Sequence, residues 1–196
     1  MSARTGTWTE AFFVNRADGS AVVSTASEAT LLNGLNDQPI IPALFFDGNK
    51  VGKAIKLWAK GVFSNTGTPT MIFQVRMGTT QGSSSLAGNS IGVTAAITTA
   101  SGVTNQQWEL YLDLVCTVPG FGTNNCTVAG AGWVDSPGGF ASPFKYALQP
   151  TTPPTGTWTV TFDASLTQYV NVSMTWSASS ASNTCTLKQL EVLGLN

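Results

Sequence analysis

The stretch WELYLDLVC, from Trp108 to Cys116, alternates apolar and polar side chains along almost its whole length. Successive side chains of a β-strand point to opposite faces of the sheet, so a period of two is typical of a half-buried strand. The face predicted to meet a core carries Trp108, Leu110, Leu112, Leu114 and Cys116. The opposite face carries Glu109, Tyr111 and Asp113.

Two further stretches repeat this pattern. Their apolar faces carry, in turn, Met71, Phe73, Val75 and Met77, and then Val170, Val172, Met174 and Trp176. Shorter or less regular strand candidates recur at intervals of about ten residues, a spacing that favours a sandwich or a barrel. They are 21–27, 40–46, 54–63, 91–97, 127–134, 158–162 and 184–193.

Three segments depart from simple alternation. The apolar phase breaks between Cys185 and Val192, and a β-bulge near Gln189 would restore it. Ser27 and Gly34 could cap and stop a helix of one or two turns. The proline-rich segment 149–156 is predicted to be a loop and not a linker, because the few strands after it cannot hide their apolar faces alone.

The length of 196 residues fits one large all-β domain. We therefore expect an all-β fold, an antiparallel β-sandwich that is jelly-roll-like and has a short N-terminal arm. Residues 1–20 are assigned to that arm or to an edge segment, and residues 21–196 to a single β-sandwich domain.

Charged residues make up only 10% of the chain, and the formal net charge is -1. Nucleic acids and anionic membranes attract a concentrated basic field, so neither is expected as a partner. The nearest approach to such a field is Lys50, Lys53, Lys56 and Lys60, which we interpret as a solvated strand edge. A neutral polar surface costs little to desolvate, which favours contacts with other proteins.

The chain contains no histidine, which is the usual general base and the commonest metal ligand. Its cysteines form no CxxC pair, and Cys116 lies on an apolar strand face, which predicts a buried thiol and not a reactive one. A pairing of Cys116 with Cys126 would close a short loop, and the sequence leaves it open. We predict no cofactor and no metal-binding residue.

Glycoside cleavage needs two carboxyl groups a few ångströms apart and no histidine. Glu109 and Asp113 share a strand face, but four residues along a strand separate them by roughly 13 Å. A partner would have to come from another strand, the candidates being Asp135, Asp163 and Glu191. We therefore predict no catalytic residue and no enzyme.

Six tryptophans invite a carbohydrate-binding interpretation, since flat aromatic faces stack on sugar rings. Trp108 and Trp176 lie on apolar phases and are predicted to be core residues. Trp58 lies between two lysines and is the better surface candidate, while Trp133 precedes a loop. Packing is nevertheless the usual role of aromatic residues in strands.

The N-terminal segment is apolar and precedes a turn-rich stretch, and its candidate interface residues are Trp8, Phe12, Phe13 and Val14. It is either an interface with a neighbouring subunit or shell protein, or the first edge strand of the domain. No basic region precedes an apolar core, and no window approaches about 18 apolar residues. We expect synthesis in the host cytoplasm without a signal peptide.

Three segments carry a family resemblance: GTPTMIFQVRMG at 67–78, YVNVSMTWSASSASN at 169–183 and LKQLEVLGLN at 187–196. From about residue 53 to the end, the chain resembles small β-sandwich virion proteins of tailed bacteriophages. The resemblance implies a jelly-roll domain that decorates or cements the head, or forms fibres on it, as trimers or other closed rings. It transfers no functional residue.

These patterns together predict a non-enzymatic phage virion structural protein, a capsid decoration protein that stabilises the shell by protein–protein contacts. Its expected partners are copies of itself, with a trimer favoured, and the major capsid protein or another virion protein. The expected location is the virion. The alternative is a receptor- or carbohydrate-binding head domain of a phage tail or fibre.

Overall fold

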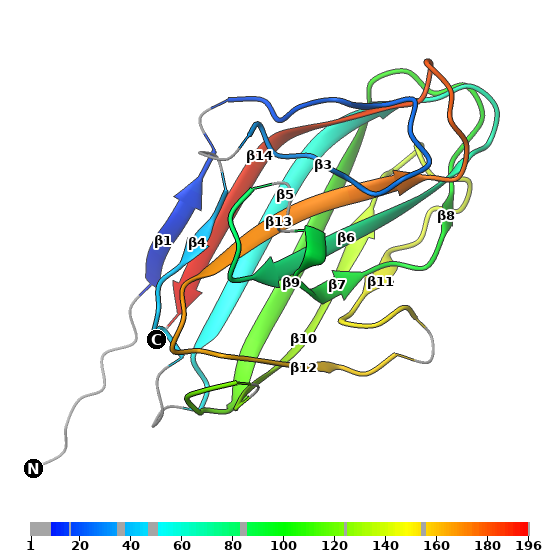
Figure 1. The fold of residues 1–196 in the computed structure, drawn as a ribbon. Helices are drawn as coiled ribbons and strands as arrows, with labels where there is room; N and C mark the ends of the chain where they lie inside the picture. The colour runs from blue at the N-terminus through cyan, green and yellow to red at the C-terminus, as the bar shows by residue number, and fades with distance from the viewer. Residues whose placement is uncertain are drawn as a thin grey trace, which may run out of the picture.

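A computed structural model describes residues 9–15, 17–34, 38–46, 51–82, 86–123, 125–153 and 156–195. Across these ranges the chain is built from β-strands, with no α-helix. Two antiparallel sheets pack face to face as a β-sandwich, which confirms the predicted fold class (Figure 1). The described ranges contain no helix long and apolar enough to cross a membrane.

The larger sheet has eight strands. Six follow one another in the order β1 (Thr9–Val14), β14 (Thr184–Leu195), β5 (Ala54–Ser64), β9 (Gln106–Val118), β10 (Cys126–Asp135) and β11 (Tyr146–Leu148). Two more lie off this path: β12 (Thr159–Phe162) pairs with β10, and β2 (Val22–Val23) pairs with β14.

The smaller sheet has six strands. Four follow in the order β3 (Ala29–Thr30), β13 (Gln168–Trp176), β6 (Thr70–Gly78) and β7 (Asn89–Val93), while β4 (Ile40–Ile41) pairs with β13 and β8 (Ile97–Thr98) with β6. In Figure 1, β13 and β6 cross in front of the long strands of the larger sheet. The outer face of the larger sheet therefore points away from the viewer.

The core lies between the two sheets and is made by the three apolar rows that the sequence predicted. Every member of the rows on β6, β9 and β13 is at most 2% exposed. The rings of Phe73 on β6 and Trp108 on β9 have their centroids 4.8 Å apart, and Trp176 on β13 meets Phe63 on β5 at 6.3 Å. Trp108 and Trp176, both predicted to be core residues, therefore each pack against a phenylalanine of the opposite sheet.

The predicted bulge on the last strand is present. The register of β14 against β5 shifts between Leu187 and Gln189. The side chain of Asn15 satisfies the disturbed backbone, because its Oδ1 accepts a hydrogen bond from the Leu190 amide at 2.6 Å and its Nδ2 donates one to the Lys188 carbonyl at 3.1 Å. Lys188 and Gln189 both point to solvent at this bulge.

The helix predicted between Ser27 and Gly34 is wrong. Ala29 and Thr30 instead form β3, and the Leu31 amide donates a hydrogen bond to the Val172 carbonyl at 2.9 Å. Leu31 and its neighbour Leu32 are both buried against the core. Tertiary burial of these two adjacent leucines outweighs the capping signal, which is a local preference of modest size.

The interpretation of the lysines as a strand edge is also wrong. Lys56 and Lys60 lie on β5, which has β14 on one side and β9 on the other and is therefore a central strand. Their side chains stand on the outer face of the larger sheet. Lys50 lies outside the described residues, and Lys53 precedes the strand and donates a hydrogen bond to the Phe45 carbonyl at 2.6 Å.

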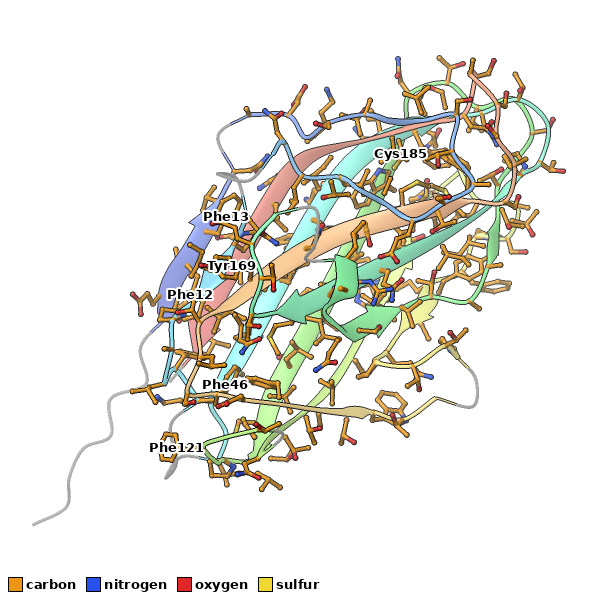
Figure 2. The ribbon with its side chains drawn as sticks, viewed as in Figure 1. Phe12, Phe13, Phe46, Phe121, Tyr169 and Cys185 are labelled. Carbon is orange, nitrogen blue, oxygen red and sulfur yellow. The ribbon has the colours of Figure 1, made fainter. Side chains whose placement is uncertain are left out.

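The N-terminal strand β1 pairs with β14 at the edge of the larger sheet. Phe12 is half-buried, and its ring meets Phe45 edge to face at a centroid distance of 4.8 Å. Figure 2 shows Phe12 and Phe13 along this edge. Part of the segment 1–20 thus joins the sandwich as an edge strand, and any further role as an arm stays a prediction.

A partly buried ion pair joins the segment before β3 to the outer face of the smaller sheet. Arg76 on β6 donates from Nε and Nη2 to the two carboxylate oxygens of Glu28, each at 2.8 Å. Ser173 on β13 donates to the same carboxylate at 2.6 Å. Burial tends to raise the pKa of Glu28, but the hydrogen bonds from Arg76 and Ser173 and the charge of Arg76 outweigh it and lower that pKa.

Truncation of a core leucine should destabilise the protein strongly. We expect Leu112→Ala to lower the free energy of unfolding by about 2–5 kcal/mol, because Leu112 is 1% exposed and its removal leaves a cavity. Val115→Ala on the exposed phase of the same strand should change it by only about 0.5 kcal/mol. Urea unfolding checks both, and equal effects would contradict the assigned strand phase.

The ion pair of Glu28 with Arg76 should make the stability of the protein depend on pH. The pKa of Glu28 is lower in the folded protein than its ordinary value of 4.5. The pair therefore stabilises the folded state fully above pH 4.5, and this stabilisation is lost as the pH falls through the pKa of the folded state. Glu28→Gln should therefore lower the melting temperature at pH 7 and lower it much less at pH 3. Glu10→Gln on exposed β1 is the control at pH 7, and a Glu28→Gln deficit that is the same at both pH values would refute the assignment.

Candidate functional site

Three aromatic side chains form a line across the outer face of the larger sheet. Trp58 on β5 is the register partner of Tyr111 on β9, and Tyr111 is the partner of Trp133 on β10. Side chains at partnered positions of neighbouring strands project to the same face. We call Trp58, Tyr111 and Trp133 the aromatic row. Trp58 is 42% exposed, so the surface position predicted for it is confirmed.

Pairs of opposite charge flank the aromatic row on both sides. On one side Lys56 Nζ lies 3.8 Å from the carboxylate of Asp113, and on the other Lys60 Nζ lies 3.5 Å from that of Glu109. The Tyr111 hydroxyl donates to Asp113 at 3.3 Å. This face is therefore polar and close to neutral, which matches the low overall charge.

Lysines also cover the aromatic rings. Lys60 Nζ lies 4.2 Å from the centroid of the Trp58 ring, and Lys145 Nζ lies 3.7 Å from that of Trp133. Tyr111 and Trp133 stack at a centroid distance of 6.1 Å and an interplanar angle of 27°. The Trp58 indole Nε1 donates to Glu109 Oε1. The row is thus held in place by its neighbours.

A pocket of about 480 Å³ lies beside Trp58 on the same face, at the bulge of β14. It is lined in part by Lys60, Gln107, Glu109, Pro137, Lys188 and Gln189. We call it the lateral pocket. Lys60 and Glu109 both line the pocket and contact Trp58, so the pocket and the aromatic row are continuous.

The structure brings one of the three candidate partners, Asp135, beside Glu109. Glu109 and Asp113 stay apart on one strand, but Asp135 on β10 is the register partner of Glu109, and Glu191 on β14 is that of Trp58. Asp163 lies at the opposite end of the sandwich, beside the β9–β10 loop. Within the described ranges no group of three or more His, Cys, Asp or Glu side chains could hold a metal ion.

A second surface feature lies at one end of the sandwich. Five large apolar side chains there, four on loops and Val118 at the end of β9, are between 48% and 68% exposed: Leu44, Val51, Val118, Phe121 and Leu166. We call them the end patch. Figure 2 shows Phe121 on the loop at this end. The sequence analysis did not predict the patch, because its residues lie singly in loops or at a strand end, where no periodicity marks them.

Backbone hydrogen bonds bring these loops together. The Leu44 amide donates to the Ala164 carbonyl at 2.8 Å, and the Gly52 amide donates to the Cys116 carbonyl at 3.0 Å. The Gly122 amide donates to the Asp163 carboxylate at 3.1 Å. Four stretches distant in sequence therefore meet at this end, each with an exposed apolar side chain close to the bond.

The predicted interface residues lie on β1, apart from Trp8, which is outside the described residues. Phe12 and Phe13 are half-buried against their own domain, and Val14 is 53% exposed. Thr9 at the start of β1 is the register partner of Leu195, and Leu195 is that of Ala54. The strand therefore starts at the end of the sandwich that carries the end patch. A role of these residues between subunits stays a prediction.

The thiols are buried and lack the setting of a nucleophile. Cys116, Cys126 and Cys185 are each 0% exposed and free. Burial raises the pKa of Cys116, and it raises that of Cys126 to about 12, with the neighbouring Cys116 adding to the effect. Burial also raises the pKa of Cys185. The thiolate, which is the reactive form, is therefore scarce near neutral pH.

Comparisons with known proteins identify no family for this chain. No protein-family model matches the chain, and no curated protein matches it. Similar solved structures include a Lotus tetragonolobus seed lectin, with 6% identity, coverage of 100% of this chain and 96% of that one, and a TM-score of 0.39. Peanut lectin with a nine-residue peptide has 10% identity, coverage of 98% and 99%, and a TM-score of 0.41.

Winged bean acidic lectin, in complex with methyl-α-D-galactose, has 8% identity, coverage of 97% and 100%, and a TM-score of 0.37. With TM-scores below 0.5 these likenesses carry no argument, and no residue role transfers from the lectins to this chain. The resemblance to phage virion proteins has no counterpart among these plant proteins.

The thiols should resist labelling in the folded protein. At pH 8 we expect a disulfide reagent such as Ellman's reagent to modify less than one thiol per chain, because all three are buried and protonated. In guanidinium chloride all three cysteines should react. Rapid modification of a thiol in the folded protein would contradict the buried assignment.

Proposed function

We propose that this chain is a non-enzymatic phage virion structural protein, a capsid decoration protein that stabilises the shell by protein–protein contacts. Its partners are further copies of itself, with a trimer favoured, and the major capsid protein or another virion protein. Its location is the virion surface. The resemblance of segments 67–78, 169–183 and 187–196 to such proteins supports this role.

The end patch is the observation that carries the proposal. Exposed apolar side chains scattered singly are ordinary, but their gathering on adjoining loops is typical of a surface that contacts another protein. The patch lies on a surface with few charges, so its burial removes little hydration from ionised groups. A decoration protein needs such an adhesive end and no reacting group.

A second candidate function is a receptor- or carbohydrate-binding head domain of a phage tail or fibre. The aromatic row favours it, because tryptophan and tyrosine combine a large apolar ring with a polar group and are enriched at binding surfaces. The two functions use different surfaces of the sandwich. They are therefore separable by substitution.

Substitution in the end patch tests the first function. We expect Phe121→Ser combined with Leu166→Ser to reduce binding to particles that lack the protein by about tenfold or more, because buried aromatic anchors contribute most of the energy of an interface. Phe144→Ser is the matched control, since Phe144 is 68% exposed and lies outside the patch. Incorporation is measured by sedimentation of particles with the added protein.

Val14→Asp in the same experiment tests the predicted N-terminal interface. Loss of incorporation by this variant alone would assign the contact to β1 and not to the end patch. Normal incorporation of the Phe121 and Leu166 variant, with an unchanged melting temperature, would refute the proposed role of the end patch.

A further inference from the structure

We infer that the lateral pocket, together with Trp58, is a binding site for an uncharged saccharide. The inference rests on the second candidate function and assigns it a site and a ligand class. Its starting point is the continuity of the pocket with an exposed indole, through Lys60 and Glu109. A volume of about 480 Å³ lies within the usual range for small-molecule sites.

The groups that line the lateral pocket fit hydroxyl groups. Gln107 and Gln189 present amides, each of which can donate and accept hydrogen bonds, and both side chains are exposed. Glu109 adds acceptors and Lys60 adds donors. A sugar hydroxyl also donates and accepts, so its hydrogen-bonding groups match those of the lining.

The charge of the pocket argues for an uncharged ligand. Lys60 lies 3.5 Å from Glu109, and Lys188 pairs with Asp18, so each cation of the pocket has a carboxylate beside it. The site therefore has no excess of positive charge to attract a phosphate, a sulfate or an acidic sugar. The polar side chains in the lining also disfavour a purely apolar ligand, because they would lose their hydration without replacement.

Trp58, which contacts the pocket residues Lys60 and Glu109, offers the ring on which a sugar would pack. Its indole Nε1 donates to Glu109, which fixes the orientation of the ring before a ligand arrives. Lys60 covers the ring at 4.2 Å, but such a cation–π contact at an exposed site contributes only ~0.5–1 kcal/mol. The flexible lysine can therefore move aside while its ammonium group stays close enough to bind a hydroxyl.

The aromatic row extends the site beyond one ring. Neighbouring strands lie about 4.8 Å apart, so Trp58 and Trp133 are separated by about 10 Å across β9. This length suits a short oligosaccharide that runs across the strands. The ligand would place one ring against Trp58 at the lateral pocket and further rings toward Tyr111 and Trp133.

The β-bulge accounts for a hollow at this point of an otherwise regular sheet face. A bulge places an extra residue on one strand and redirects the side chains near it. Here it turns both Lys188 and Gln189 outward, where they line the pocket. Asn15 bonds the backbone on both sides of the bulge, so the pocket wall is held in place.

Glycan binding by the full-length chain tests the inference. On an array of uncharged, sialylated and sulfated glycans, we expect binding to uncharged members only. Titration of the best binder should show affinity about tenfold weaker for Trp58→Ala, owing to the lost aromatic packing. Trp158→Ala is the matched control, because Trp158 is 59% exposed and lies beside β12, outside the aromatic row.

Gln189→Ala gives an independent test at the exposed bulge and should also weaken binding, which matters if Trp58→Ala fails to fold. Binding to uncharged glycans that neither Trp58→Ala nor Gln189→Ala weakens would overturn the site and keep the second candidate function. Binding to acidic glycans alone would overturn the ligand class. Absence of binding to every glycan would overturn the inference and the carbohydrate-binding form of the second candidate function, and would leave its receptor-binding form.

Discussion

Packing of the two sheets against each other is the constraint on which the whole structure depends. Phe73 and Trp108 meet across the sandwich at a centroid distance of 4.8 Å, and the apolar rows of β6, β9 and β13 are all buried between the sheets. Burial of such rows is the dominant favourable term in folding. Because each strand alternates, the same arrangement directs every second side chain outward, and on the larger sheet these outward positions carry the aromatic row.

The outer faces of the two sheets differ in how far the chain itself covers them. On the smaller sheet, the Glu28 side chain binds Arg76 and Ser173, so the segment before β3 covers part of that face. On the larger sheet, the outward positions of β5, β9 and β10 carry the aromatic row and its charge pairs. A bulge in β14 then hollows this face beside Trp58. Both proposed functions therefore concern adhesion, one at the end patch and one on this face.

The arrangement of ionisable groups is consistent with binding chemistry. Lysines and carboxylates alternate on the open face and pair at 3.5–3.8 Å, while the thiols lie in the core with raised pKa values. The register of β9 and β10 places Glu109 beside Asp135, yet Glu109 is also the acceptor for Trp58 and lies close to Lys60. Through its contacts with Trp58 and Lys60, Glu109 holds the aromatic row in position.

By itself, the sequence determined the strand phases, the core membership of Trp108 and Trp176, the bulge near Gln189 and the exposure of Trp58. These properties follow from a period of two, which is local and can be read within a few residues. Only the tertiary structure decided that β5 is central, that residues 29–30 are a strand, and that Trp58, Tyr111 and Trp133 share one line. The tertiary structure also brought the residues of the end patch together. Strand order, register and contacts between loops are non-local properties. They depend on which distant segments pair through hydrogen bonds and cover one another's apolar faces.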